Sequence, residues 1–243
     1  MPTIWAIGPT LLSKILADSY ISWGGAAACF ETLPEHMPLP DEVFWLSVPP
    51  EGFSDSPQDL ATTSLDLPIA LKESQATRLT LPLVVTARGI LYGEAIGQRG
   101  AIAWQPEPLS DPQRQLLYKA ARKIVGSTVK PGVTLLHFAV SPEALLFKSL
   151  SPFPDESALV TLNSQQPDLF TCHWRCVLGL PIIDLQVRRP SAAYFQPSVP
   201  LSAQVRQAAL LEADASLQLS GHLLQVQAAS LCTAQEILHR IVD

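Results

Sequence analysis

Between residues 79 and 151, predicted strands alternate with one amphipathic helix, and this order limits the folds that the chain can adopt. Strands are expected in LTLPLVVTARG, ILYGEAIG and GAIAWQ, and a second pair in GVTLLHFAV and ALLFKSL. The helix lies between the two groups, at residues 111–125, and carries its leucine, isoleucine and valine side chains on one face. The pattern predicts an α/β (mixed α+β) fold with a mixed or antiparallel sheet flanked by helices.

Local capping signals mark the starts of two helices. Ser110 and Gln113 form a capping box ahead of the helix at 111–125. Thr233 and Glu236 have the same spacing, which predicts that a last helix begins there with an apolar face of isoleucine, leucine and valine. A strand pair is expected shortly before it, in ASLQLSGHLLQVQA.

The first part of the chain predicts a short α/β unit. A buried strand is expected in TIWAIG, a helix in TLLSKILADSYIS and a second strand in VFWLSV. Residues 49–64 have the prolines, glycine and small polar residues of a linker. We therefore divide the chain into a shortened N-terminal α/β portion with its linker (1–64), a sheet-and-helix domain (65–185) and a small C-terminal β-rich subdomain (186–243).

Charge and hydropathy exclude several classes of protein. The formal net charge of −6 and the absence of a basic stripe argue against nucleic acid as a partner. The N-terminus does not resemble a signal peptide, and no apolar run approaches the about 20 residues of a membrane span, so we expect a cytoplasmic protein. Only 16% of the residues are charged and the mean hydropathy is +0.21. Either a protein partner covers part of the surface, or the surface is rich in uncharged polar side chains.

The stretch PDLFTCHWRCVL gathers reactive side chains on a predicted helix at 167–178. Cys172 and Cys176 share a helical face, but no second motif completes the about four ligands of a zinc site. His173 is adjacent to Cys172, and adjacent helical side chains point apart, so the two do not form a nucleophile with its base. We expect both cysteines in the core, with His173 and Arg175 at its rim.

A longer stretch, residues 149–182, carries a resemblance to a known family. Its string SLSPFPDESALVTLNSQQPDLFTCHWRCVLGLPI is similar, without gaps, to NEIAPRPHNSGHWT, a spacer and SQFEQHLRAVLGLPL in N5-carboxyaminoimidazole ribonucleotide synthase, an ATP-grasp enzyme of purine biosynthesis. The strand GVTLLHFAV resembles that family's GVLAVELFV. The resemblance covers roughly residues 79–243 and implies an ATP-grasp-like fold there.

The resemblance also implies a ligase that uses ATP and Mg²⁺ to join a carboxylate to an amine. In that family the two strands carry the metal-binding carboxylates, and the corresponding positions here are His137 and Lys148–Ser149. An imidazole, an ammonium and a hydroxyl do not replace the hard anionic oxygens that Mg²⁺ requires. The family's glycine-rich loop with its lysine, and its basic loop near the C-terminus, have no counterpart either.

The family's arginine, histidine and asparagine in PRPHNSGH are Phe153, Asp155 and Glu156 in this chain. From the sequence we therefore expect no catalytic residue, no metal and no cofactor. A remnant of the cleft would still be able to bind a small polar ligand, unless Asp155 and Glu156 form a solvated turn. The residues expected to line that remnant are His137, Lys148, Ser149, Asp155, Glu156, His173 and Arg175.

The sequence leaves three interpretations open. The favoured one is a non-catalytic relative of the ATP-grasp ligases that acts as a binding or assembly module. The second is an active ATP-dependent carboxylate–amine ligase with a rebuilt site, in which Asp155 and Glu156 take over Mg²⁺. The third is an unrelated α/β domain, which a structure without a mixed sheet flanked by the helices at 111–125 and 167–178 would support.

Overall fold

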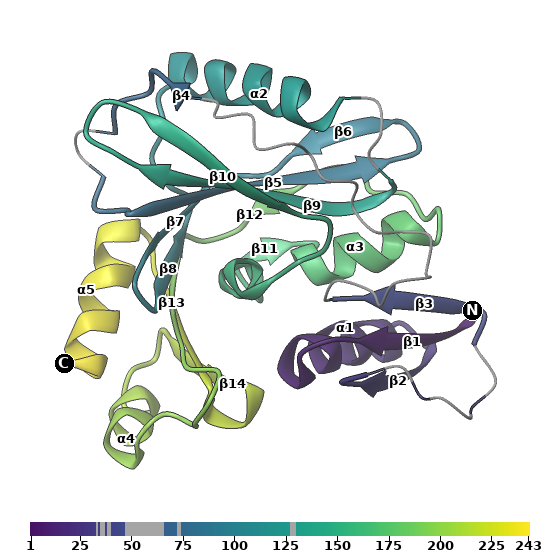
Figure 1. The fold of residues 1–243 in the computed structure, drawn as a ribbon. Helices are drawn as coiled ribbons and strands as arrows, with labels where there is room; N and C mark the ends of the chain where they lie inside the picture. Colours follow the sequence, from purple (N-terminus) through teal and green to yellow (C-terminus); the bar gives the residue numbers. More distant parts are fainter. Residues whose placement is uncertain (33, 35–36, 38–39, 47–65, 72–73, 127–129) are drawn as a thin grey trace.

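A three-stranded and a ten-stranded sheet organise the molecule in this computed structural model, which describes residues 1–32, 34, 37, 40–46, 66–71, 74–126 and 130–243 (Figure 1). The N-terminal unit contains β1 (Thr3–Ile7), α1 (Thr10–Ser22), β2 (Ala26–Phe30) and β3 (Glu42–Trp45). The large sheet contains β4 (Asp66–Leu67), β5 (Arg78–Thr86), β6 (Gly89–Tyr92), β7 (Ile96–Arg99), β8 (Ile102–Gln105), β9 (Gly132–Val140), β10 (Leu145–Ser151), β13 (Ser191–Phe195), β14 (Ala215–Gln218) and β15 (Leu223–Gln227). The helices around it are α2 (Asp111–Val125), α3 (Leu169–Val177), α4 (Ala203–Leu210) and α5 (Leu231–Val242), with the 3₁₀ turns η1 (Glu156–Thr161) and η2 (Leu219–Gly221). A separate strand pair is formed by β11 (Gln165–Gln166) and β12 (Gln186–Val187).

The large sheet is antiparallel and runs in the order β14-β15-β13-β8-β7-β5-β9-β10-β4, with β6 also paired to β5. Its longest pairing joins β5 to β9, from Arg78 opposite Ala139 to Val85 opposite Gly132. Successive residues of a strand point to opposite faces, so this register decides which side chains meet each covering layer.

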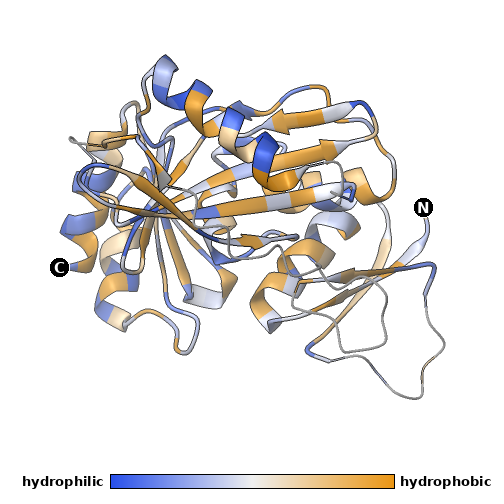
Figure 2. Ribbon diagram, turned by 45° about the horizontal axis from the view of Figure 1, so that its top comes forward, coloured by the Kyte–Doolittle hydropathy of each residue, from blue (hydrophilic) through white to orange (hydrophobic). Residues whose placement is uncertain are grey.

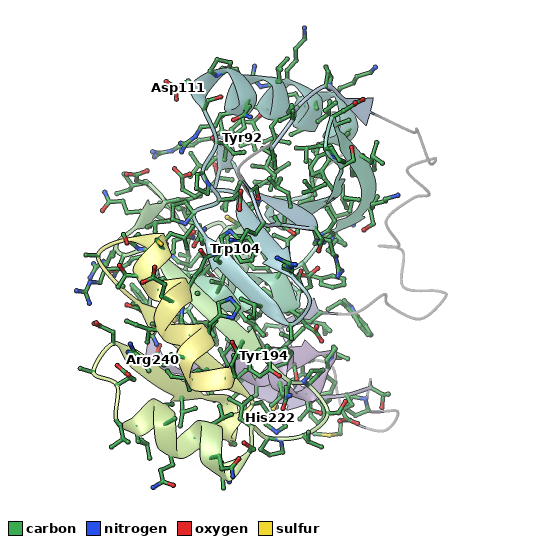
Figure 3. The ribbon with its side chains drawn as sticks, turned by 90° about the vertical axis from the view of Figure 1, so that its left-hand side faces the viewer. Tyr92, Trp104, Asp111, Tyr194, His222 and Arg240 are labelled. Atoms are coloured by element: carbon green, nitrogen blue, oxygen red, sulfur yellow. The ribbon has the colours of Figure 1, made fainter. Side chains whose placement is uncertain are left out.

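One face of the sheet is covered by two helices in turn. Leu79, Leu81 and Leu83 of β5 pack with the buried side of α2. Farther along the same face, α5 lies over Trp104 of β8 and buries Leu238 (Figure 3). Hydropathy follows this division, because the central strands are mainly hydrophobic and the helices carry both kinds of residue (Figure 2).

The opposite face is covered by α3, η1 and the N-terminal unit (Figure 1). In that unit β1 lies between β2 and β3 and is parallel to both. Helix α1 packs on α3, where the Trp174 indole donates to the Ser19 hydroxyl at 3.1 Å and meets the Tyr20 ring edge-on at 5.1 Å. No helix in the described part of the chain is long and apolar enough to cross a membrane.

The predicted fold class is confirmed, and with helices on both faces of the sheet the unrelated-domain interpretation loses its support. The capping box of Ser110 and Gln113 is present at the start of α2. The division into three parts stays a prediction: the large sheet crosses residue 185 through the pairing of β13 with β8, and the linker at 49–64 lies outside the described residues.

Two predicted helix starts are wrong. Helix α5 begins at Leu231, because the Ser230 hydroxyl accepts the Thr233 N–H at 3.1 Å and makes Ser230 the N-cap. Helix α3 begins at Leu169 rather than Pro167, because the Asp168 carboxylate caps its first turn.

The reactive residues of α3 serve the core. Cys172 and Cys176 are buried, and burial raises the pKa of the Cys176 thiol to about 11 and that of Cys172 well above its usual range. His173 is buried as well, so its predicted place at the rim is wrong. Burial lowers its pKa to about 4, and its Nδ1 accepts the Val133 N–H at 3.0 Å.

Thiol labelling tests this assignment. Because the thiolate is the reactive form and a buried thiol is neither ionised nor accessible, we expect 5,5′-dithiobis(2-nitrobenzoate) to modify only the exposed Cys29 and Cys232 in the native protein. The same reagent should modify all four cysteines in guanidinium chloride. Rapid labelling of Cys172 or Cys176 in the native protein, located by peptide mass spectrometry, would contradict it.

Candidate functional site

Polar side chains interrupt the inner face of β5 and β9. On β5, Val84 lies in the core with α3, whereas Thr80 and Arg78 on the same side are polar. On β9, Leu135 belongs to that core and His137 follows it on the same side. Thr80 and His137 are direct cross-strand partners. The inner face therefore changes from apolar to polar toward the Arg78 end of β5.

The His137 ring is held at both nitrogens. Its Nδ1 lies 3.0 Å from the Thr80 hydroxyl, and its Nε2 lies 3.0 Å from Asp155 Oδ2. The Ser151 hydroxyl lies 3.4 Å from the same Nε2. The side chains of His137 and Asp155 are only 18% and 27% exposed, so their contact is partly shielded from water. A shielded contact between an imidazole and a carboxylate is stronger than one in full solvent.

Both carboxylate oxygens of Asp155 are occupied. Oδ1 accepts the Ser157 N–H at 2.9 Å and its hydroxyl at 2.6 Å, and Oδ2 accepts the Ser151 hydroxyl at 3.2 Å beside His137. Burial raises the pKa of Asp155, but the bond and charge of His137 and the bonds from Ser157 outweigh it, so the pKa is lowered. Asp155 is thus the N-cap of η1 and ties η1 to β9, instead of lying in a solvated turn.

The order Thr80, His137, Asp155 is also that of a hydroxyl nucleophile, its base and an orienting carboxylate. Thr80, however, is 2% exposed and its hydroxyl lies within the paired strands. A substrate has no access to it. The arrangement therefore acts as a hydrogen-bond network that fixes His137.

Of the other predicted cleft residues, Ser149 lies near this cluster. It is exposed and directly opposite His137 in the pairing of β10 with β9. The register of β10 shifts between Phe147 and Ser149, and Lys148 lies exposed at this irregularity. The two strand positions that the resemblance assigns to metal ligands are thus neighbours in space.

His173 and Arg175 lie elsewhere. The His173 ring contacts the backbone of Val133, four residues from His137 and therefore about 13 Å along the strand. Arg175 donates to the Pro181 carbonyl at 2.6 Å and stacks over the Trp23 ring at 5.2 Å. Both side chains hold α3 in place and do not join the cluster around His137.

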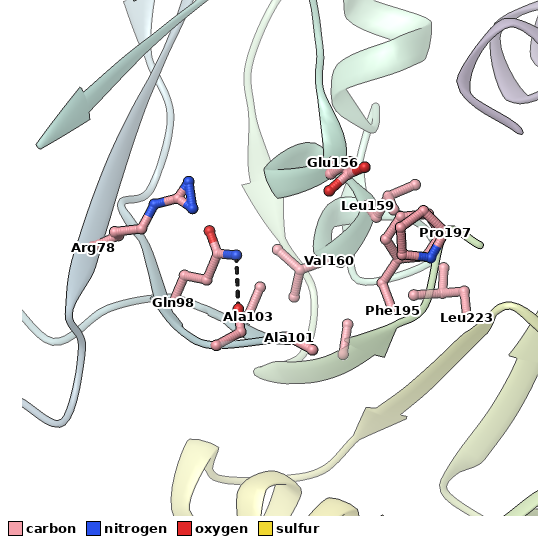
Figure 4. A pocket seen from close by; sticks show the side chains of 12 residues that line it. Arg78, Gln98, Ala101, Ala103, Glu156, Leu159, Val160, Phe195, Pro197 and Leu223 are labelled. Carbon is pink, nitrogen blue, oxygen red and sulfur yellow. Dashed lines mark hydrogen bonds between the residues drawn. The ribbon is translucent and has the colours of Figure 1, made fainter. Parts of the chain in front are cut away.

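A pocket of about 340 Å³ opens next to the cluster, between η1 and the sheet (Figure 4). Its floor is a row of cross-strand neighbours, Arg78 on β5, Gln98 on β7, Ala103 on β8 and Ala193 on β13. Ala103 and Ala193 leave space for the pocket above them, because their side chains end at Cβ.

The walls of the pocket differ in character. Glu156, Leu159 and Val160 of η1 close it from above the sheet, and Phe195 and Leu223 form its apolar end (Figure 4). Glu156 is exposed toward the pocket, and its pKa is raised by partial burial and by the charge of Asp155, against the opposing effect of Arg78.

Arg78 and Gln98 were missed by the sequence analysis. A signal was available, since Arg78 and Thr80 are polar at every second position of a strand whose intervening residues, Leu79 and Leu81, are apolar. Gln98 carries no comparable signal, because only the pairing of β7 with β5 places it beside Arg78.

The residues at this position do not fit a divalent metal. In the described part of the chain, no group of three or more histidine, cysteine, aspartate and glutamate side chains could hold one. The nearest carboxylate, Asp155, has both oxygens engaged by His137, Ser151 and Ser157. A metal there would have to displace these bonds.

Comparisons with known proteins identify related chains. No protein-family model matches the chain. A formate-dependent phosphoribosylglycinamide formyltransferase of Haloquadratum walsbyi is 38% identical over 91 residues, which are 37% of this chain and 23% of that protein. The corresponding enzyme of Marinobacter nauticus is 33% identical over 120 residues, 47% of this chain and 31% of that protein. The chain thus matches about a quarter to a third of the length of these curated relatives.

Solved structures match more of the chain. N5-carboxyaminoimidazole synthetase of Staphylococcus aureus has a TM-score of 0.71 at 11% identity, and the match covers 99% of this chain and 97% of that one. Carboxyaminoimidazole ribonucleotide synthase of Aspergillus clavatus, in complex with ATP, has a TM-score of 0.60 at 20% identity over 69% of this chain and 50% of that one. The fold of this chain is therefore that of the ATP-grasp enzymes, as the resemblance in its sequence implied.

Within that class, the neighbours in structure are N5-carboxyaminoimidazole ribonucleotide synthases, and the relatives in sequence are formate-dependent phosphoribosylglycinamide formyltransferases. These neighbours correct one expectation. We expected no cofactor, but the A. clavatus enzyme has been solved with ATP and, separately, with ADP and 5-aminoimidazole ribonucleotide. Loss of the cation ligands at two strand positions was too narrow a basis for excluding a nucleotide.

Replacing Asp155 with asparagine tests the link between η1 and β9. We expect the free energy of unfolding to fall by about 1–3 kcal/mol at pH 7, because an amide cannot accept bonds on both sides and one donor stays unpaired. Folding lowers the pKa of Asp155, so its carboxylate contributes stability above the unfolded pKa, and this contribution disappears as the pH falls through the folded pKa.

Urea unfolding from pH 7 down to pH 3 is the measurement. The difference between wild type and Asp155→Asn should shrink below pH about 4. Asp18→Asn, an exposed position on α1, is the matched control and should change little at any pH. A pH-independent difference for Asp155→Asn would refute the carboxylate–imidazole link.

Proposed function

We propose that this chain acts as an ATP-dependent ligase that joins a small carboxylate to an amine, with a rebuilt acceptor site. The proposal takes up the ligase of the second interpretation in place of the non-catalytic one, but without its assignment of Mg²⁺ to Asp155 and Glu156, because the Asp155 oxygens are already engaged. Its support is the similarity to formate-dependent formyltransferases in sequence and to synthetases solved with ATP or ADP in fold. Formate or bicarbonate is the carboxylate that these relatives suggest.

The observation that carries the proposal is the pocket beside His137 and Asp155. It presents a guanidinium from Arg78 on the sheet and a carboxylate from Glu156 on η1. A volume of about 340 Å³ falls at the lower end of the roughly 300–1,000 Å³ found for small-molecule sites. A small acceptor amine fits such a pocket.

ATP, when bound, supplies the phosphoryl group that activates the carboxylate. In the pocket, Glu156 would accept a proton from the acceptor amine, and a raised pKa brings a carboxylate closer to the strength of a useful base. A C–N bond then forms to the activated carbon and phosphate leaves with the bonding electron pair. Asp155 and His137 would hold η1, and with it Glu156, at a fixed distance from the sheet.

Turnover by a Glu156→Gln variant tests this role. The wild type should release ADP when given Mg-ATP, formate or bicarbonate, and an amine. The variant should lose about 100-fold or more in kcat, which is the lower range for removing a general base. The wild-type rate should rise with pH through the pKa of Glu156, because the base must be deprotonated, and the variant should lack this rise.

Glu143→Gln, exposed in the turn between β9 and β10, is the control and should retain the wild-type rate. Equal kcat for Glu156→Gln and wild type would remove Glu156 from the mechanism. Absence of carboxylate-dependent ADP release for every amine tried would refute the ligase itself.

A second candidate rests on one observation. His137 lies where the resemblance expects a metal-binding carboxylate, and its ring is already held by Thr80 and Asp155. A binding or assembly module that keeps the fold without turnover accounts for this substitution. It predicts no ADP release under any condition, and its expected protein partner stays a prediction.

A further inference from the structure

The charges of the pocket balance each other. Among its lining residues, Arg78 carries the positive charge and Glu156 the negative one. The relatives act on phosphoribosyl compounds by name, and a phosphate dianion would meet one guanidinium here together with the opposing carboxylate of Glu156. Like charges within a few ångströms repel, and more so where water is partly excluded. The pocket is therefore unsuited to a phosphorylated ligand.

Both charged groups are available to a ligand. Within the described part of the chain, neither Arg78 nor Glu156 takes part in an ion pair. Arg78 nevertheless lowers the pKa of Glu156, so the two charges act on each other across the pocket. Gln98 lies beside Arg78, and its Nε2 donates to the Gly100 carbonyl at 3.0 Å (Figure 4). No group among the described residues donates to the Gln98 side-chain oxygen, which can therefore accept a hydrogen bond from a ligand.

The far end of the pocket is apolar. Phe195 and Leu223 are cross-strand partners on β13 and β15, and Val160 of η1 lies between them and Arg78 (Figure 4). The Val160 carbonyl accepts the Gln225 amide of β15 at 2.8 Å and the Ser191 hydroxyl of β13 at 3.2 Å. These bonds hold η1 at a constant height above the floor, so the space is formed before a ligand enters.

We propose that this pocket binds a free amino acid with an apolar side chain. The planar guanidinium of Arg78 matches a carboxylate, which accepts two parallel N–H bonds from such a fork. The ammonium lies between the Glu156 carboxylate and the Gln98 carbonyl, and the side chain fills the space toward Phe195 and Leu223. Binding of the amino acid in this pocket does not depend on the proposed ligase function. As the acceptor amine of the ligase, the amino acid rests on the proposed function, with Glu156 taking the proton that the ammonium gives up.

Three ligands of one shape separate the contributions. L-Phenylalanine carries both charges, 3-phenylpropionate lacks the ammonium, and 2-phenylethylamine lacks the carboxylate. Calorimetric titration of the full chain without nucleotide should give an affinity for phenylalanine at least tenfold above that for either analogue. Arg78→Gln should reduce phenylalanine binding about tenfold or more and leave phenylethylamine binding unchanged. Glu156→Gln should also weaken phenylalanine binding, but it should leave the affinity for phenylpropionate unchanged or increase it.

Arg88→Gln, exposed in the turn between β5 and β6, is the control and should bind all three ligands as the wild type does. Equal affinities for the three ligands, no binding of phenylalanine, or tighter binding of 5-aminoimidazole ribonucleotide would each overturn the inference. Phenylalanine binding without any ATP turnover would sink only the ligase. The chain could instead turn over formate with another amine, while phenylalanine neither serves as a substrate nor inhibits that reaction. This result would contradict only the amino-acid site.

Discussion

The antiparallel pairing of β5 with β9 determines where every other layer of this molecule lies. Its register, from Arg78 opposite Ala139 to Val85 opposite Gly132, sends alternate side chains to opposite faces. One set meets α2, and the other meets α3 and η1. Shifting this register by one residue would exchange the two sets and bury His137 among the leucines under α2. The polar cluster and the pocket therefore exist because this pairing holds.

The site sits where the apolar character of the inner face ends. Toward α3 the strands contribute valine and leucine, and the space is filled. Toward the other end Ala103 and Ala193 contribute only methyl side chains, and Asp155 fixes η1 to β9 by binding His137. The position of the site and the pocket beside it therefore both depend on η1, a short 3₁₀ turn. Its N-cap Asp155 also contacts β9 through His137.

Much of the fold could be predicted from the sequence, because its signals are local. Ser110 and Gln113 cap α2 through contacts within four residues, and the alternating pattern of β5 and β9 needs no knowledge of their partners. The predicted start of α5 was wrong because Ser230 and Thr233, three residues apart, can both act as N-cap. The spacing of residues alone does not show which of them caps the helix. The predicted position of His173 at the rim was wrong because the environment of its side chain depends on Val133, forty positions away in the chain.

The candidate site was only half predictable for the same reason. The resemblance aligned His137 and Ser149, which the structure brings opposite each other, and drew attention to Asp155 and Glu156. Arg78 and Gln98 belong to strands that meet only in the folded sheet. The resemblance implied a loss of acidic ligands, and from this we expected a protein without a nucleotide, whereas solved neighbours from A. clavatus carry ATP or ADP. Substitutions at a few positions were therefore not enough evidence for the absence of an activity.

The most direct test of the ligase follows an oxygen atom. Activation of a carboxylate by ATP transfers one carboxylate oxygen to the phosphate that is finally released, whereas simple ATP hydrolysis takes that oxygen from water. The chain would be incubated with Mg-ATP, ¹⁸O-labelled formate and an amine, and the phosphate examined by ³¹P NMR. The account predicts one labelled oxygen in each phosphate released. Phosphate without label, or no phosphate above the rate without formate, would contradict it.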